Sequence, residues 1–311
     1  KCNGVFYHLC NSKRRIYRGS WIDQNRNQRR GRVWKEGNYP LKQDDFLSKF
    51  LVDYVCDTNQ EDEIIYETYY ENLEKYTEGI LLKKNGLYEL YQLPEDKFII
   101  YHWATCRFAF GYWIEDFEKG NIVSCYFNPK LKEEIPLDAV RFFSCAGMHS
   151  KLLQKKALVF HSSYIAWNGK AILFAGPSGV GKSSQAKLWE QHAKAEIING
   201  DRTLLRKKDN LWMAYGYPCC GSSSICINRT LPIAAIVILE QGSENRIEVL
   251  ENREKICAIL TGSENYRWNI KEIESICEIA EQLVKEILII KLICRKDEDA
   301  VLTLRKWMEE D

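Results

Sequence analysis

The sequence has no hydrophobic run long enough to cross a membrane as a helix. Its longest aliphatic stretch, residues 233–239, is far shorter than the roughly 20 apolar residues that a transmembrane helix needs. The first ten residues also lack the long apolar core of a secretory signal. We therefore expect a cytoplasmic protein that has no membrane partner.

The twelve cysteines include no C-x-x-C pair. They are spread along a long chain, and Cys219 and Cys220 are adjacent, which indicates reduced thiols rather than a disulfide framework. Cys2, His8 and Cys10 are close enough in sequence to suggest zinc. No second pair of ligands follows at zinc-finger spacing, so we do not expect a metal there.

Internal repeats and low-complexity tracts are also absent, and the composition is ordinary. With 45% hydrophobic and 28% charged residues, the chain is neither wholly disordered nor fibrous. Its 311 residues can form one large domain, or a small domain joined to a medium one. We expect a basic segment over residues 1–55, a β-rich region over 56–148 and an α/β core over 149–311.

The net charge of +1 conceals an asymmetry along the chain. Residues 1–50 contain 12 Lys and Arg against 4 Asp and Glu, a net of +8, which leaves −7 on the remainder. Such a segment can be a solvated tail, or it can contact an acidic peptide, nucleic acid or the protein's own body. Because only this charge points to nucleic acid, we do not expect a nucleic-acid partner.

Turn signals divide the rest of the chain into short elements. Asn85-Gly86 and Asn168-Gly169 each suit a two-residue hairpin turn, which predicts hairpins over residues 81–91 and 164–175. Apolar and aromatic runs predict further strands at 98–102, 108–113, 197–198, 233–239 and 288–293. Helical spacing predicts helices at 182–192, 251–260, 270–287 and from about 297.

The strongest signal is GPSGVGKS at residues 176–183, between a predicted strand and a predicted helix. It matches the phosphate-loop pattern G-x-x-x-x-G-K-[ST] without a mismatch. Glycines let backbone N–H groups turn toward a polyphosphate, while Lys182 can reach the outer phosphates and Ser183 can ligate Mg²⁺. We expect ATP to be held by Gly176, Ser178, Gly179, Val180, Gly181, Lys182, Ser183 and Ser184. The loop recognises phosphates rather than a base, so GTP and pyrophosphate stay open as alternative donors.

The strand before this loop is the second arm of a hairpin, whereas an ordinary P-loop NTPase has parallel neighbours there. With this topology, the run HSSYIAWNGKAILFAGPSGVGKSSQAKLW…EIINGD, residues 161–201, resembles the HPr kinase group of the phosphoenolpyruvate carboxykinase-like P-loop superfamily. In that group a histidine opens the hairpin and an aspartate follows the next strand. The resemblance implies an α/β fold in which a smaller β-rich N-terminal region precedes a P-loop kinase core.

The resemblance places His161 and Asp201 in the active site, with Lys182 as the third catalytic residue. An aspartate at this position can orient a hydroxyl, accept its proton, or hold Mg²⁺ together with Ser183. Asp201 can equally be a turn residue, and His161 a partly buried polar residue. HPr kinases have two or three aspartates here, whereas this sequence has one, followed by Arg202, which can stabilise a phosphoryl group or form an ion pair.

These features favour an HPr kinase-like serine kinase that uses ATP and Mg²⁺. Its acceptor would be a serine of a peptide or protein, a modified-peptide precursor being one candidate, and the small residues of 216–224 would face it. Two alternatives remain open: a nucleotide-binding regulatory module without transfer activity, and a kinase of a small hydroxyl metabolite such as free serine. A homo-oligomer is compatible with each of them.

Overall fold

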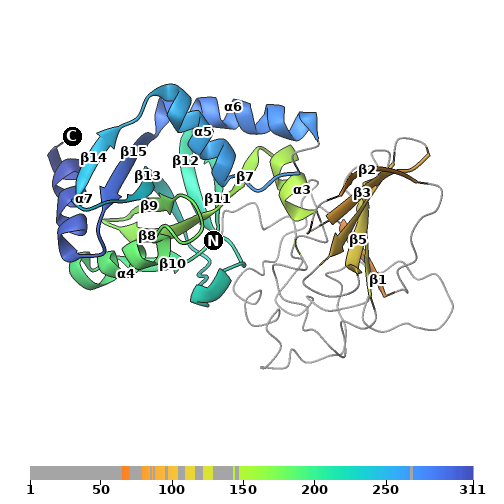
Figure 1. Ribbon diagram of the computed structural model, residues 1–311, viewed down its shortest axis with the longest axis horizontal. Helices are drawn as coiled ribbons and strands as arrows, with labels where there is room; N and C mark the ends of the chain where they lie inside the picture. The colour runs from red at the N-terminus through yellow and green to blue at the C-terminus, as the bar shows by residue number, and fades with distance from the viewer. Residues whose placement is uncertain are drawn as a thin grey trace. The chain divides into compact units, whose positions relative to one another are not determined.

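The computed structural model describes most of the chain after residue 146 and a set of strands before it (Figure 1). The described residues are 65–70, 79–84, 86, 88–94, 97–103, 109–115, 122–128, 143, 147–266 and 269–310. The chain divides into two compact units between Lys151 and Leu152, inside helix α3 (Met148–Gln154). No helix among the described residues is long and apolar enough to cross a membrane.

The first unit contains a six-stranded sheet with the order β1-β6-β5-β4-β3-β2. Its strands are β1 (Ile65–Tyr70), β2 (Ile80–Lys84), β3 (Tyr88–Gln92), β4 (Phe98–Trp103), β5 (Ala109–Glu115) and β6 (Ile122–Phe127). All neighbouring pairs are antiparallel except β1 and β6, which are parallel. The hairpin predicted over residues 81–91 is confirmed by the pairing of β2 with β3, although Asn85 of its turn lies outside the described residues.

Tyrosine side chains form a row across this sheet. The ring of Tyr101 lies 5.7 Å from that of Tyr91 and 5.0 Å from that of Tyr112, and Tyr112 stacks on Tyr126 at 4.6 Å between centroids. Tyr101 is directly opposite Tyr112, and Tyr112 is directly opposite Tyr126. Such opposed aromatic pairs stabilise a sheet by about 0.2–1 kcal/mol each. The bounds of β4 and β5 confirm the strands predicted at 98–102 and 108–113, although Phe108 lies outside the described residues.

The second unit is built on a nine-stranded mixed sheet. Its main order is β10-β8-β9-β13-β12-β11-β7, and β15 pairs with both β13 and β14. The strands are β7 (Ala157–Phe160), β8 (Ser162–Trp167), β9 (Lys170–Ala175), β10 (Glu196–Asn199), β11 (Thr203–Lys208), β12 (Leu211–Gly216), β13 (Thr230–Gln241), β14 (Arg246–Val249) and β15 (Leu288–Cys294). The helices after α3 are α4 (Lys182–Ala193), α5 (Asn252–Gly262), α6 (Ile270–Glu286) and α7 (Glu298–Glu310).

The hairpin of β8 and β9 forms as the sequence predicts. Its two turn residues, Asn168 and Gly169, have φ angles of 49° and 75°. Positive φ at both positions defines a type I′ turn, whose twist matches that of the flanking strands. β9 therefore has an antiparallel neighbour in β8 and a parallel neighbour in β13.

Strand β13 connects the two halves of this sheet. Its first residues pair with β12, whereas from Ala235 onward it lies between β9 and β15 and is parallel to both. A register shift between Ile233 and Ala235 marks the change. The carboxyl ends of β9, β13 and β15 consequently meet at one edge, where open α/β sheets bind their ligands.

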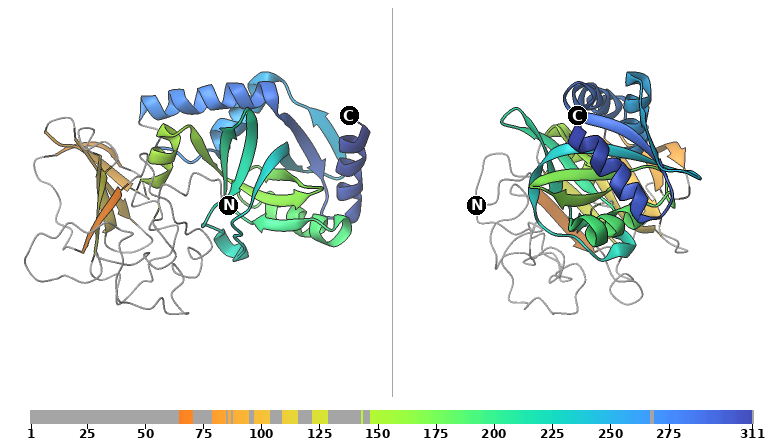
Figure 2. Two further views of the ribbon diagram at one scale, coloured as in Figure 1. Left: turned by 180° about the vertical axis from the view of Figure 1, so that it is seen from behind. Right: turned by 90° about the vertical axis from the view of Figure 1, so that its left-hand side faces the viewer.

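Helices cover both faces of the second sheet (Figures 1 and 2). On one face, Trp189 of α4 and Val301 of α7 pack with Phe174 of β9. On the other face, Ile259 of α5 and Ile276 of α6 belong to a separate buried cluster. The expected α/β fold is thus confirmed as a three-layered mixed α/β unit, and the packing holds the end of β9 and the start of α4 in place.

Candidate active site

Residues 176–181 form the tight connection between β9 and α4. Gly176, Gly179 and Gly181 have φ angles of 141°, 80° and 116°, a region that side-chain-bearing residues rarely adopt. A Cβ atom on Gly176 would also lie 3.1 Å from the carbonyl oxygen of Leu239 in β13. Glycine is therefore required at position 176 by both its backbone angle and the space beside β13.

Lys182 is the first residue of α4, and its side chain returns over the loop. Its Nζ donates hydrogen bonds to the carbonyl oxygens of Gly176 at 2.9 Å and Pro177 at 3.1 Å. Burial lowers the pKa of Lys182, an effect that the negative charge of Asp201 partly opposes. The loop thus holds one cation at its centre.

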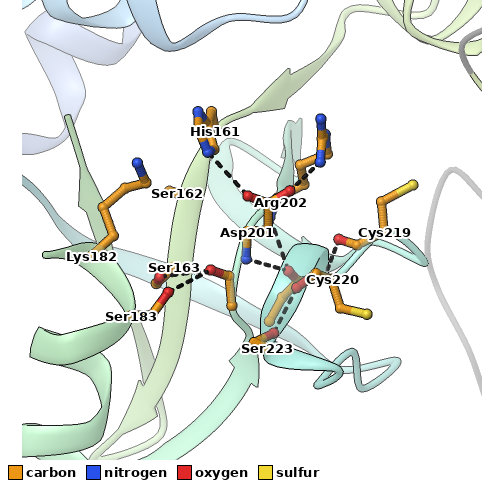
Figure 3. A network of polar contacts seen from close by, with 12 residues as sticks. His161, Ser162, Ser163, Lys182, Ser183, Asp201, Arg202, Cys219, Cys220 and Ser223 are labelled. Carbon is orange, nitrogen blue, oxygen red and sulfur yellow. Dashed lines mark hydrogen bonds and ion pairs between the residues drawn. The ribbon is translucent and has the colours of Figure 1, made fainter. Parts of the chain in front are cut away.

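Ser183 joins the first turn of α4 to the turn after β10. Its Oγ donates a hydrogen bond to the carbonyl oxygen of Gly200 at 3.3 Å. Ser163 of β8 donates to the same oxygen at 2.9 Å (Figure 3). These two bonds fix the residue immediately before Asp201 beside the helix that begins at Lys182.

Asp201 and His161 face each other across the site. Nε2 of His161 lies 3.1 Å from Oδ1 of Asp201. Burial raises the pKa of Asp201, but the hydrogen bond to His161 and the electrostatic effects of Arg202, His161 and Lys182 outweigh it. The pKa of Asp201 therefore falls below its ordinary value, and the side chain is a carboxylate at neutral pH.

Arg202 lies between two carboxylates. Its guanidinium pairs with Asp201 through NH1 and with Glu264, the second residue after α5 (Asn252–Gly262), through Nε. Its side chain is only 20% exposed, and the two carboxylates raise its pKa above the ordinary value against the effect of burial. Of the two roles that the sequence leaves open for Arg202, the structure shows an ion pair, and that pair is part-buried.

Asn199 orders the backbone around Asp201. Its Oδ1 accepts hydrogen bonds from the backbone N–H groups of Asp201 and Arg202, each at 2.9 Å. Its Nδ2 donates to the carbonyl oxygens of Tyr217 at 2.6 Å and Cys219 at 3.2 Å. One buried amide thus ties the aspartate turn to the start of the loop over residues 216–224.

That loop packs directly against the aspartate. A Cβ atom on Gly221 would lie 2.8 Å from Cγ of Asp201, and Gly221 has a φ of 54°.

A hydrogen bond from Cys226 lowers the pKa of the neighbouring Cys220 below its ordinary value, although burial and Asp201 act in the opposite direction. All seven cysteines in the described part of the chain are free thiols.

The donor set suits a magnesium ion that is bound mainly through phosphate. The part of the chain that the structure describes gathers no group of three or more His, Cys, Asp and Glu side chains that could hold a metal. Mg²⁺ does not need such a group, because it usually binds one or two protein oxygens together with waters and substrate phosphates. The hydroxyl of Ser183, which contacts the Gly200 carbonyl, and the carboxylate of the next residue, Asp201, can supply those oxygens.

The structure brings together His161, Lys182, Ser183 and Asp201, which the sequence names as site residues. Ser178 is exposed, and Ser184, in the first turn of α4, lines a cavity. Sequence reasoning missed Asn199 and Glu264. Asn199 is the last residue of the short strand β10 and precedes Gly-Asp, a usable turn signal, whereas nothing near Glu264 indicates that it reaches the site.

The fold and this site define a mixed α/β protein with a glycine-rich strand–loop–helix connection beside a paired histidine and aspartate. Residues 123–294, more than half of the chain, match the family model described as SynChlorMet cassette protein ScmC. The chain belongs to this family. Among solved structures, it is similar to the HPr(Ser) kinase/phosphatase from Coxiella burnetii, with 12% identity and a TM-score of 0.28 over 49% of this chain and 93% of that one. No curated protein matches the chain.

Proposed function

We propose that this chain is a P-loop kinase of the HPr kinase-like type that transfers a phosphoryl group from Mg-ATP to the hydroxyl of a serine in a peptide or protein. The observation that carries the proposal is the contact of Ser183 with the Gly200 carbonyl at 3.3 Å. It sets a phosphate-loop sequence and a carboxylate within one connected network. Phosphoryl transfer depends mainly on positioning and on electrostatic stabilisation, and this network offers both.

The glycine loop and Lys182 would bind the donor. The curled backbone of residues 176–181 can direct N–H groups at the phosphates, and the start of α4 adds its positive dipole end. Lys182 would exchange its bonds with the Gly176 and Pro177 carbonyls for bonds to the outer phosphates. When bound, Mg²⁺ would neutralise charge on the phosphates, held by Ser183 and Asp201.

Asp201 would act on the acceptor. Its carboxylate would accept a hydrogen bond from the serine hydroxyl, orient the oxygen toward the γ-phosphorus and take up the proton during transfer. A bond then forms between the serine oxygen and phosphorus, and the bond from phosphorus to the β,γ-bridging oxygen breaks, which releases ADP. Because its pKa is lowered, Asp201 is ionised at neutral pH and can accept this proton.

The loop over residues 216–224 supports a peptide or protein acceptor. It packs against Asp201 and consists largely of small residues, so an extended backbone can approach the carboxylate closely. The basic residues 1–50 would attract an acidic acceptor segment and would make association sensitive to salt.

Phosphoryl transfer itself tests the proposal. The purified chain would be incubated with Mg-[γ-³²P]ATP and either serine-containing peptides or free serine, and the products separated by mass. We expect label on a peptide serine, and about 10²-fold less label with Asp201→Asn. Label on free serine alone would show that the chain is a kinase of a small metabolite and would overturn the peptide or protein acceptor.

A second candidate is a nucleotide-binding regulatory module, and the pairing of Asp201 with Arg202 favours it specifically. If that ion pair occupies the carboxylate permanently, ATP would bind without transfer. Tight ATP binding together with no label on any acceptor would support this module and overturn the kinase proposal.

A further inference from the structure

The last residue of α5 and the two residues that follow it pair with the end of β7. The backbone N–H of His161 donates to the carbonyl oxygen of Gly262 at 2.8 Å. The backbone N–H of Glu264 donates to the carbonyl oxygen of Val159 at 2.9 Å. One short segment therefore holds the backbone of His161, whose ring contacts Asp201, and brings Glu264 to the same edge of the sheet.

Close packing fixes this segment on two sides. Phe160 and Ser263 form an antiparallel bridge, and a Cβ atom on Gly262 would lie only 2.4 Å from a ring carbon of Phe160. On the side of α5, Oγ of Ser263 donates to the carbonyl oxygen of Ile259 at 2.6 Å. The backbone that carries Glu264 is thus held by both β7 and α5.

Arg202 is a single cation between two carboxylates. Its Nε donates to Glu264 and its NH1 to Asp201 (Figure 3). The exposed fractions of Arg202, Glu264 and Asp201 are only 20%, 31% and 22%, so solvent screens these charges weakly. Burial lowers the pKa of Arg202, but the carboxylates raise it further, Glu264 more than Asp201. Glu264 is therefore the stronger of the two partners.

The proposed transfer requires Asp201 to exchange its pairing with Arg202 for a hydrogen bond from the acceptor hydroxyl. While Glu264 is present, Arg202 keeps a carboxylate partner throughout this exchange. If Glu264 lost its charge, Asp201 would be the one carboxylate that the structure pairs with Arg202. Its release would then leave a part-buried cation unpaired, which is costly.

We infer that Glu264 is a positioning residue for phosphoryl transfer, which holds Arg202 so that Asp201 is free to bind the acceptor hydroxyl. Glu264 acts through Arg202 and gives or takes no atom in the reaction. This inference rests on the proposed function, because it assumes that Asp201 acts on the acceptor.

Transfer rate and ATP affinity, measured on the same full-length variants, test this role. The rate is that of label transfer from saturating Mg-[γ-³²P]ATP to a mixture of acidic serine-containing peptides, and calorimetry gives the affinity. Glu264→Gln keeps the shape of the side chain but not its charge. We expect it to lower the rate about tenfold, a size typical of coupled neighbours, and to leave ATP affinity unchanged. Glu274→Gln, an exposed glutamate of α6, is the matched control and should change neither.

Two further variants separate the charge of Glu264 from a purely structural effect. Glu264→Asp, which keeps the charge, should retain more of the rate than Glu264→Gln. In chains that already carry Arg202→Gln, adding Glu264→Gln should change the rate less than about twofold, because no guanidinium remains to be held.

A tenfold loss that persists without Arg202 would overturn the inference, as would a lower rate in Glu264→Asp than in Glu264→Gln. An equal loss of ATP affinity in Glu264→Gln would also overturn it. The wild-type rate in Glu264→Gln would overturn the positioning role and leave the kinase proposal standing. No label from the wild-type chain would overturn the proposed function and this inference together.

Discussion

The imidazole of His161 and the carboxylate of Asp201 lie 3.1 Å apart, although forty positions separate them in the sequence. The pairing of β8 with β10 explains the contact, because His161 directly precedes β8 and Asp201 follows β10 by two residues. A strand start and a strand end therefore meet at one point. This geometry makes His161 a positioning residue for Asp201.

Asp201→Asn should lower phosphoryl transfer by about 10²-fold or more, the loss expected when a positioned acid–base group is removed. ATP affinity should stay within a few fold of the wild-type value, because Lys182 and the loop bind the phosphates. Single-turnover transfer and calorimetry measure the two effects. Asp209→Asn, an exposed turn residue, is the control. Wild-type turnover in the Asp201 variant would move the catalytic role elsewhere.

His161→Leu should shift the pH dependence of transfer. The hydrogen bond to His161 lowers the pKa of Asp201, so its loss raises that pKa toward the ordinary value. The acidic limb of the kcat/KM profile should then move to higher pH. His161→Gln, which can keep a donor near Oδ1, should retain most of the wild-type profile. Superimposable profiles for wild type and His161→Leu would contradict the positioning role.

Ser183→Ala should mainly impair the use of magnesium. The variant loses the hydroxyl that can ligate Mg²⁺ and the hydrogen bond to Gly200. We expect the Mg²⁺ concentration needed for half-maximal transfer to rise about tenfold or more. Ser275→Ala, at a half-buried position of α6 outside the loop, is the matched control. An unchanged Mg²⁺ requirement would remove Ser183 from the metal site.

His102 should make the first unit less stable in acid. It is 6% exposed in β4, and burial, with a smaller contribution from His149, lowers its pKa to about 3. The unfolded chain binds a proton near pH 6.5, so stability is complete above that value and falls as the pH decreases toward 3. Between pH 7 and 5 the loss should be about 2 kcal/mol.

Urea unfolding of the full chain at pH 7 and pH 5 measures this loss. His102→Phe should reduce the difference between the two pH values, whereas His192→Phe, at an exposed position of α4, should keep it. The same pH dependence in His102→Phe and in wild type would show that His102 does not cause it.

Local patterns predict the centre of the second unit well. Asn168-Gly169 predicts its turn because two positive φ angles have few alternatives, and the glycines of 176–181 predict the loop for the same reason. Strand β7 and α3, by contrast, are not among the predicted elements, and neither are β11, β12 and β14. Strand β7 and α3 are both short, and β7 is buried throughout, so neither shows a period that distinguishes helix from strand.

Long-range partners are the part of the site that sequence patterns do not predict. Glu264 reaches Arg202 across 62 positions because α5 returns the chain to the end of β7, where Ser263 pairs with Phe160. Asn199 acts through four hydrogen bonds to backbone groups, two of them around residues 217–219. Such contacts depend on the packed fold and not on local spacing.

The most direct test is the affinity of Mg-ATP for Lys182→Ala, measured by calorimetry beside Lys187→Ala. Lys182 is the buried cation of the loop, and Lys187 is an exposed lysine on the same helix. We predict that Lys182→Ala weakens ATP binding by about 10²-fold, while Lys187→Ala binds as the wild type does. Equal ATP affinity in wild type and both variants would contradict the claim that residues 176–183 bind the phosphates of the donor.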